Sequence, residues 1–179
     1  PSSAASDVYK RLGVATLYLE LLQAVAELDA VFVPIGLGSG ASGMIAARDA
    51  LGLKTEVVGV VSQHSPAYAR SFAARKPISV PSETRLADGM ACRTPDTGAL
   101  EIMLRGLSRI VEVSDNQVAE AMRTLYSCTH NVAEGAGATS FAALTQERER
   151  WAGKRVAVIL SGGNVDTAVL VSVLSSQFK

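Results

Sequence analysis

The sequence predicts a three-layer α/β fold, in which a mostly parallel, twisted sheet carries helices on both faces. Four short segments, 30–35, 56–61, 108–113 and 155–160, are dominated by continuous runs of apolar residues. Such runs are typical of strands that are buried on both faces. Helical segments alternate with these strands along the chain, and this alternation favours a parallel sheet.

The first half of the chain divides into elements by its periodicity and its turn residues. Residues 1–12 are small and polar, then basic, and are predicted to form a tail or entry loop. Leucines at helical spacing predict a helix over 13–28. The first strand is followed by a glycine-rich turn over 36–43 and by a helix over 44–51, which Gly52 can end.

The second half of the chain repeats this pattern. Ser65-Pro66 can start a helix that ends before Pro77, and residues 78–94 look irregular. Ser114 and Gln117 form a capping box that starts a helix running to about residue 128. A helix is predicted over 97–107. The small residues at 134–138 lead into another helix, which ends near residue 151. A turn over 161–164 and a final apolar segment to about residue 174 complete the chain.

Composition excludes several classes of function. The 17 Lys and Arg residues balance 17 Asp and Glu residues, so the chain has no basic excess for a nucleic-acid partner. The start of the sequence does not resemble a signal peptide, and no apolar run approaches the ~18 residues that span a bilayer. Cys92 and Cys128 form no metal-binding pair and fit a reducing compartment. We therefore expect a cytoplasmic protein with no membrane partner.

The glycine-rich turn after the first strand predicts an anion site. Four glycines, from Gly36 to Gly43, let backbone N–H groups converge, and the helix that follows adds a favourable dipole. The segment from Gly38 to Gly43 matches the dinucleotide pattern GxGxxG, but the second strand has its only acid, Glu56, at its start instead of its end. No GxxxxGK[ST] segment is present, so the anion is not held by a P-loop.

A second glycine turn, Ser161-Gly162-Gly163-Asn164-Val165-Asp166, follows the last strand. Val33-Pro34-Ile35, Gly36-Leu37-Gly38-Ser39, Ala87-Asp88-Gly89, Glu134-Gly135-Ala136-Gly137-Ala138 and this turn occur in the order and spacing of one family. In these motifs, which cover roughly residues 13–170, the chain resembles the serine/threonine dehydratases, fold type II enzymes that use pyridoxal 5'-phosphate.

The resemblance implies a role for each matching residue. The phosphate loop of the family falls on the segment that starts at Gly36, where Leu37 and Ser39 depart from an all-glycine pattern. Ser161 matches the serine that hydrogen-bonds the pyridine nitrogen, Glu134 matches a glutamate close to the ring, and Asp88-Gly89 matches a loop near the active-site mouth. The implied cofactor-binding residues are Gly36, Leu37, Gly38, Ser39, Gly40, Glu134 and Ser161.

Two departures from the family pattern also matter. Some relatives bind a divalent cation at positions that correspond to Val61 and Ala67, and an apolar pair cannot ligate a hard cation. No lysine of this chain sits in the family's Ser-x-Lys-x-Arg-Gly motif, so the Schiff-base lysine is expected upstream of Pro1.

The resemblance thus implies that residues 13–179 are the large cofactor domain, without its N-terminal lysine-bearing segment and without the small domain. The high proportion of hydrophobic residues, 48%, fits a chain whose missing part covers apolar surface.

The function implied is that of a lyase that removes water and ammonia from a β-hydroxy amino acid, such as threonine or serine, and leaves a 2-keto acid. Family resemblance also implies a homo-oligomer. A racemase or β-replacement enzyme is the alternative within the family. A non-catalytic remnant that binds a phosphorylated ligand is the alternative from another class, and a dinucleotide or methyl-donor fold is the third. His64 and His130 are further candidates for neighbours of the cofactor or substrate.

Overall fold

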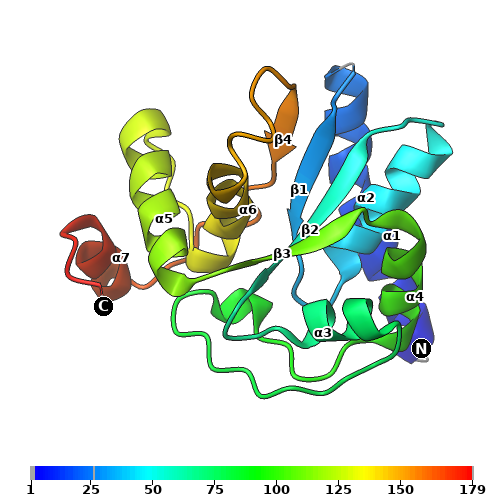
Figure 1. Cartoon of the computed structure of the whole chain (residues 1–179), viewed down its shortest axis with the longest axis horizontal. Helices are drawn as coiled ribbons and strands as arrows, with labels where there is room; N and C mark the ends of the chain where they lie inside the picture. Colours follow the sequence, from blue (N-terminus) through cyan, green and yellow to red (C-terminus); the bar gives the residue numbers. More distant parts are fainter. Residues whose placement is uncertain (1–2, 26, 179) are drawn as a thin grey trace.

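The computed structural model describes residues 3–25 and 27–178, with residues 3–12 described as helix backbone only. The four strands form one parallel sheet in the order β3-β2-β1-β4 (Figure 1). The strands are β1 (Ala30–Pro34), β2 (Glu56–Ser62), β3 (Arg109–Val113) and β4 (Val156–Val158). All four lie within the predicted segments or within one residue of them, and the predicted parallel arrangement is confirmed.

Helices cover both faces of the sheet, as the continuous apolar strands predict (Figure 1). In β1, Val31 and Val33 pack into one core cluster, whereas Ala30 and Phe32 pack into the other. The first cluster includes side chains of α1 (Ser3–Ala24), α2 (Ser39–Ala50), α3 (Ala67–Ala74) and α4 (Thr97–Gly106). The second includes side chains of α5 (Asp115–Thr129), α6 (Gly135–Gln146) and α7 (Thr167–Leu174). A short 3-10 helix, η1 (Asp88–Met90), interrupts the otherwise irregular segment between α3 and α4.

Several boundaries differ from the sequence prediction. Helix α1 begins at Ser3, so residues 3–12 are not a tail; this stretch contains no glycine or proline to stop a helix. Pro1 and Ser2 lie outside the described residues. Helix α2 begins at Ser39, so residues 39–43 of the predicted glycine turn are helical. Here the glycine composition reflects close packing, because a Cβ added at Gly43 would lie 3.2 Å from the backbone nitrogen of Ala15 in α1.

The predicted helix caps agree with the structure. Ser114 Oγ accepts a hydrogen bond from the backbone nitrogen of Gln117 at 3.2 Å, and Gln117 Oε1 accepts one from the backbone nitrogen of Ser114 at 2.8 Å. This reciprocal capping box starts α5 as predicted. Gly52, just beyond α2, has φ of 64°, the left-handed conformation expected after a helix end.

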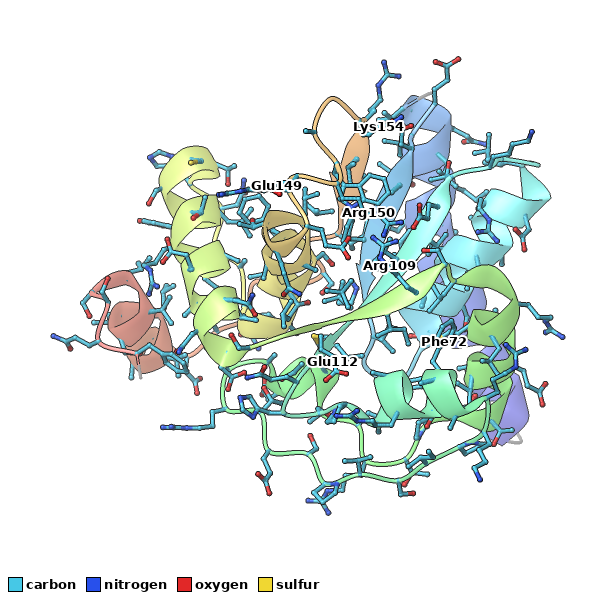
Figure 2. The ribbon with its side chains drawn as sticks, viewed as in Figure 1. Phe72, Arg109, Glu112, Glu149, Arg150 and Lys154 are labelled. Atoms are coloured by element: carbon cyan, nitrogen blue, oxygen red, sulfur yellow. The ribbon has the colours of Figure 1, made fainter. Side chains whose placement is uncertain are left out.

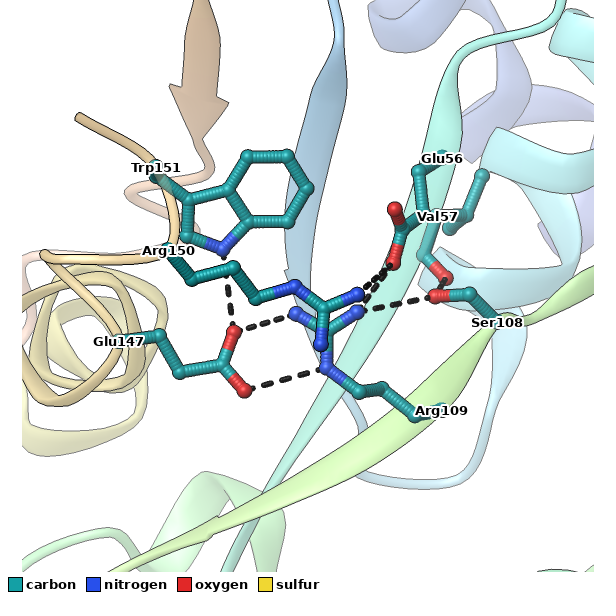
Figure 3. Close-up of polar contacts among 7 residues, drawn as sticks. All are labelled: Glu56, Val57, Ser108, Arg109, Glu147, Arg150 and Trp151. Carbon is teal, nitrogen blue, oxygen red and sulfur yellow. Dashed lines mark hydrogen bonds and ion pairs between the residues drawn. The ribbon is translucent and has the colours of Figure 1, made fainter. Parts of the chain in front are cut away.

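A polar cluster connects the segment that follows α6 to the amino ends of β2 and β3 (Figures 2 and 3). Arg109 donates hydrogen bonds to Glu56 and to both carboxylate oxygens of Glu147, and its guanidinium lies 5.6 Å from the ring centre of Trp151. Trp151 also donates to Glu147 at 3.1 Å. Burial alone would raise the pKa of Glu147, but these hydrogen bonds and the charges of Arg109 and Arg150 hold it below its ordinary value.

Candidate cofactor site

One cavity of about 620 Å³ lies at the carboxyl ends of β1 and β4. It brings together all the cofactor-binding residues that the resemblance implies, although they come from three segments far apart in the sequence. These residues are Gly36, Leu37, Gly38, Ser39, Gly40, Glu134 and Ser161.

The position of the cavity follows from the topology of the sheet. The chain leaves β1 to form β2 and then β3 on one side, and β4 later pairs with β1 on the other side. The turns after β1 and β4 therefore diverge at the point where the strand order reverses. Open α/β sheets bind their ligands at this point, outside the carboxyl ends of the strands.

The first glycine turn offers unpaired backbone donors to this cavity. Within the described part of the chain, the backbone N–H groups from Gly36 to Ala41 donate no hydrogen bond, whereas that of Ser42 donates to the carbonyl of Gly38 at 3.0 Å. Gly38 adopts φ of 96°, a conformation that favours glycine, and it directly precedes α2. Free N–H groups at the start of a helix of this length form a cradle for an anion.

A close backbone contact holds the Asp88-Gly89 segment beside this turn. A Cβ added at Gly36 would lie 2.7 Å from the carbonyl oxygen of Gly89, so only glycine fits there without a shift. Gly89 and Met90 line the cavity, while the carboxylate of Asp88 accepts a hydrogen bond from the Gly89 nitrogen at 2.9 Å. The predicted loop therefore does lie at the edge of the cavity.

The second glycine turn packs against the start of α6. The backbone nitrogen of Glu134 donates to the carbonyl of Gly162 at 3.0 Å. A Cβ added at Gly162 would lie 2.6 Å from Oε1 of Glu134, and one added at Gly163 would lie 2.6 Å from the carbonyl oxygen of Val132. These glycines bring the hydroxyl-bearing Ser161 and the carboxylate of Glu134 to the same wall of the cavity.

Sequence reasoning missed the contribution of α1. Val14, Leu17 and Tyr18 line the cavity, and burial raises the pKa of Tyr18 to about 12, so its hydroxyl remains a neutral donor near pH 7. A Cβ added at Gly40 would lie 3.1 Å from that hydroxyl. The sequence shows Tyr18 only as a tyrosine within an apolar helical stripe. This pattern predicts that the side chain is buried, but it does not show whether the side chain lies in the core or lines a cavity.

Other candidates lie elsewhere. His64 and His130 are exposed and do not line the cavity; His130 caps the end of α5 in a left-handed conformation. Val61 and Ala67 are both buried. No lysine with a described side chain lines the cavity. Among the described residues, no cluster of three or more His, Cys, Asp or Glu side chains could hold a metal ion, and no helix is long and apolar enough to cross a membrane.

The fold and the cavity together define a class: an α/β protein with an anion cradle at the switch point of a parallel sheet. The sequence profile of the pyridoxal-phosphate dependent enzymes matches residues 2–162 of the chain. The chain belongs to this family, which confirms the resemblance drawn from its motifs and identifies pyridoxal phosphate as the cofactor of the fold.

Individual relatives agree with this assignment. The chain is 37% identical to the phenylserine dehydratase of Ralstonia pickettii over 158 residues, which cover 88% of this chain and 48% of the relative. It is 29% identical to the L-threonine ammonia-lyase of Thermotoga maritima over 170 residues, which cover 95% of this chain and 42% of the relative. The chain therefore spans about half the length of these relatives.

Structural comparison supports the fold class. The processed form of threonine deaminase isoform 2 from Solanum lycopersicum superposes with a TM-score of 0.86 at 21% identity, over 91% of this chain and 48% of that one. The three-layer parallel architecture predicted from the sequence is thus the architecture of a fold type II pyridoxal-phosphate enzyme.

The residues present fit the family's cofactor. A phosphate group needs several donors, and the turn after β1 carries unpaired N–H groups at the start of a helix. A flat ring needs an approach without bulky side chains, and the cavity wall contains Gly89, Ala136 and the turn beginning at Ser161. A pyridine nitrogen needs a hydrogen-bonding partner, which the exposed hydroxyl-bearing Ser161 can supply.

Proposed function

We propose that the chain is the C-terminal part of a pyridoxal-phosphate-dependent ammonia-lyase that acts on a β-hydroxy amino acid such as threonine or serine. The observation that carries the proposal is the convergence of Gly36–Gly40, Glu134 and Ser161 on one cavity at the switch point of the sheet. The names of the relatives, a threonine ammonia-lyase and a phenylserine dehydratase, support this substrate class.

The residues that converge on the cavity have different tasks in this proposal. The backbone N–H groups from Gly36 to Gly40 bind the phosphate, and the hydroxyl of Ser161 bonds the pyridine nitrogen. A neutral hydroxyl, in place of a carboxylate, limits protonation of the ring. Glu134, which lines the same cavity, would lie close to the ring. Pyridoxal phosphate, when bound, supplies an electron sink for the charge that develops at the α-carbon of the substrate.

We propose that residues 13–179 belong to the large cofactor domain and that the lysine-bearing segment and the small domain lie outside this chain. Strand β4 supports this division, since it pairs only with β1 among the described strands and its three residues are each only partly buried. Leu160, two residues beyond β4, is 40% exposed. Apolar side chains at an unpaired strand edge fit a surface that further parts of the same protein cover.

The first experiment is an intact mass of the natural gene product after borohydride reduction. A lyase gives a mass above 18.7 kDa with one reduced pyridoxyl-phosphate adduct on a lysine outside this chain. That protein should also release ammonia and a 2-keto acid from L-threonine, L-serine or phenylserine. A product of 18.7 kDa without an adduct would favour the non-catalytic remnant.

The same assay separates the alternatives within the family. A racemase gives the enantiomer of the amino acid without ammonia, and a β-replacement enzyme consumes an added nucleophile. We further propose a homo-oligomer in the cytoplasm, a compartment that fits the free thiols of Cys92 and Cys128. Light scattering and cell fractionation test these two points.

A further inference from the structure

A buried tyrosine on α3 contacts the back of the first glycine turn. Tyr68 is 1% exposed and does not line the cavity. Its hydroxyl lies 2.8 Å from the carbonyl oxygen of Leu37 and 3.1 Å from the backbone nitrogen of Asp96. Asp96 is itself fixed, because its carboxylate caps α4 by accepting a hydrogen bond from the Ala99 nitrogen at 2.7 Å. The hydroxyl therefore joins the turn after β1 to the start of α4.

The direction of both hydrogen bonds is determined by their partners. A backbone N–H can only donate, so the hydroxyl accepts from Asp96 and donates its own proton to Leu37. The peptide between Leu37 and Gly38 is planar and trans, and its C=O and N–H groups therefore point in opposite directions. Because the C=O points toward the buried Tyr68, the N–H of Gly38 points to the opposite side.

That opposite side is the cavity. Gly38 lines the cavity, whereas a Cβ added to it would meet Met103, Ala99 and the Tyr68 hydroxyl, the last at 2.9 Å. The N–H of Gly38 donates no hydrogen bond within the described residues. Without the Tyr68 hydroxyl, nothing in the described contacts of the Leu37 carbonyl would hold this peptide against rotation.

We propose that Tyr68 is a positioning residue, which fixes the Leu37–Gly38 peptide so that the Gly38 N–H is presented to a phosphate monoester in the cavity. The inference rests on the proposed function, since it requires the turn to bind the phosphate of the cofactor. Its consequence is selectivity: the hydroxyl favours the phosphorylated form of the cofactor over pyridoxal, which has no phosphate for this donor.

The test compares two ligands in the Tyr68→Phe variant of the natural full-length protein. The dissociation constants of pyridoxal phosphate and of pyridoxal are measured by absorbance titration of the apoprotein. Loss of one oriented donor should weaken pyridoxal phosphate by about threefold to tenfold and leave pyridoxal unchanged. Tyr126→Phe, which removes an exposed hydroxyl from α5, is the matched control and should change neither constant.

Two outcomes would overturn the inference. Equal weakening of both ligands would mean that Tyr68 supports the fold in general, and no weakening would mean that the peptide keeps its orientation unaided. Replacement of Tyr68 by 4-aminophenylalanine covers the case in which Tyr68→Phe does not fold. It retains a donor toward Leu37 and should keep the wild-type ratio of the two constants, and a lost ratio would also count against the proposal.

A further variant separates this inference from the proposed function. Gly38→Ala places a Cβ at a positive φ and against Met103, and it should weaken pyridoxal phosphate strongly if the turn binds phosphate. If Gly38→Ala binds the cofactor normally, the cavity is not the phosphate site and the proposed function fails. If Gly38→Ala weakens binding and Tyr68→Phe does not, only the role of Tyr68 fails.

Discussion

The two neighbouring glycines of the second turn, Gly162 and Gly163, should respond differently to replacement by alanine. In Gly162→Ala the new Cβ meets the carboxylate of Glu134, which is the end of a long side chain and makes no capping bond to α6. In Gly163→Ala the new Cβ meets the carbonyl oxygen of Val132, which can move only with its backbone. Both contacts are 2.6 Å. The two variants therefore differ in whether the contacted group is a side chain that can move or a backbone carbonyl that cannot move alone.

The magnitudes follow from these contacts. Replacing glycine by alanine reduces the entropy of the unfolded chain and stabilises by about 0.4–1 kcal/mol. Moving the Glu134 side chain costs about 0.5–1.5 kcal/mol, so Gly162→Ala should remain within about 1 kcal/mol of the wild type. Displacing backbone costs about 1–3 kcal/mol, so Gly163→Ala should lose about 1–2 kcal/mol.

Urea unfolding measures both free energies, and absorbance titration with pyridoxal phosphate measures the site. Gly162→Ala should unfold like the wild type but bind the cofactor more weakly, because the displaced carboxylate of Glu134 disturbs the cavity wall. Gly163→Ala should unfold at lower urea. Equal destabilisation by the two substitutions would refute the reasoning, because Glu134 would then be as rigid as the backbone.

Three further predictions concern titratable groups. Glu147→Gln should lower the free energy of unfolding by about 1–3 kcal/mol at pH 7, against no change for the solvent-exposed Glu149→Gln. The contribution of Glu147 is complete above the ordinary carboxyl pKa of 4.5 and is lost as the pH falls through its lowered pKa, so the wild type and Glu147→Gln should converge in acid-unfolding curves. For Tyr18, whose pKa is raised from 10.0 to about 12, stability should fall as the pH rises from 10 to 12, and Tyr18→Phe should remove this component in alkaline melting curves. Mass spectrometry after treatment with iodoacetamide at pH 8 should find label on the exposed Cys128 before Cys92, whose pKa burial raises; equal labelling would contradict the buried position of Cys92.

Local patterns predicted the strands and the caps because their causes are local. A continuous apolar run such as Val57-Val58 specifies burial on both faces, and Ser114 with Gln117 specifies a helix start, wherever the rest of the chain lies. The order of the strands has no such local cause. The pairing of β4 with β1 joins residues more than a hundred positions apart. A parallel sheet can place both glycine turns at one edge, but only the resemblance to a family indicated that they share one cofactor.

Residues that act through long-range contacts were missed for the same reason. Tyr18 and Tyr68 both appear in the sequence as aromatic residues on apolar helix faces. Tyr18 lines a cavity with Gly38 and Gly40, and the Tyr68 hydroxyl reaches the Leu37 carbonyl, 31 positions away in the sequence. Helix α1 was also predicted to be shorter, because small polar residues resemble a tail while still being able to form a helix.

The first glycine turn departs from an all-glycine pattern only where the structure has space for a side chain. Gly38 has a positive φ, and a Cβ at Gly36 would collide with the Gly89 carbonyl, so these two positions require glycine. Leu37 and Ser39 have no such requirement: neither has a positive φ, and Leu37 is 73% exposed. The donors of the loop are backbone N–H groups, which side chains at these two positions leave in place. Glycine at either position would add no donor and would raise the entropy of the unfolded chain, a cost of about 0.5–1 kcal/mol. Leucine and serine therefore leave the unpaired N–H groups of the turn in place and lower the entropic cost of ordering it.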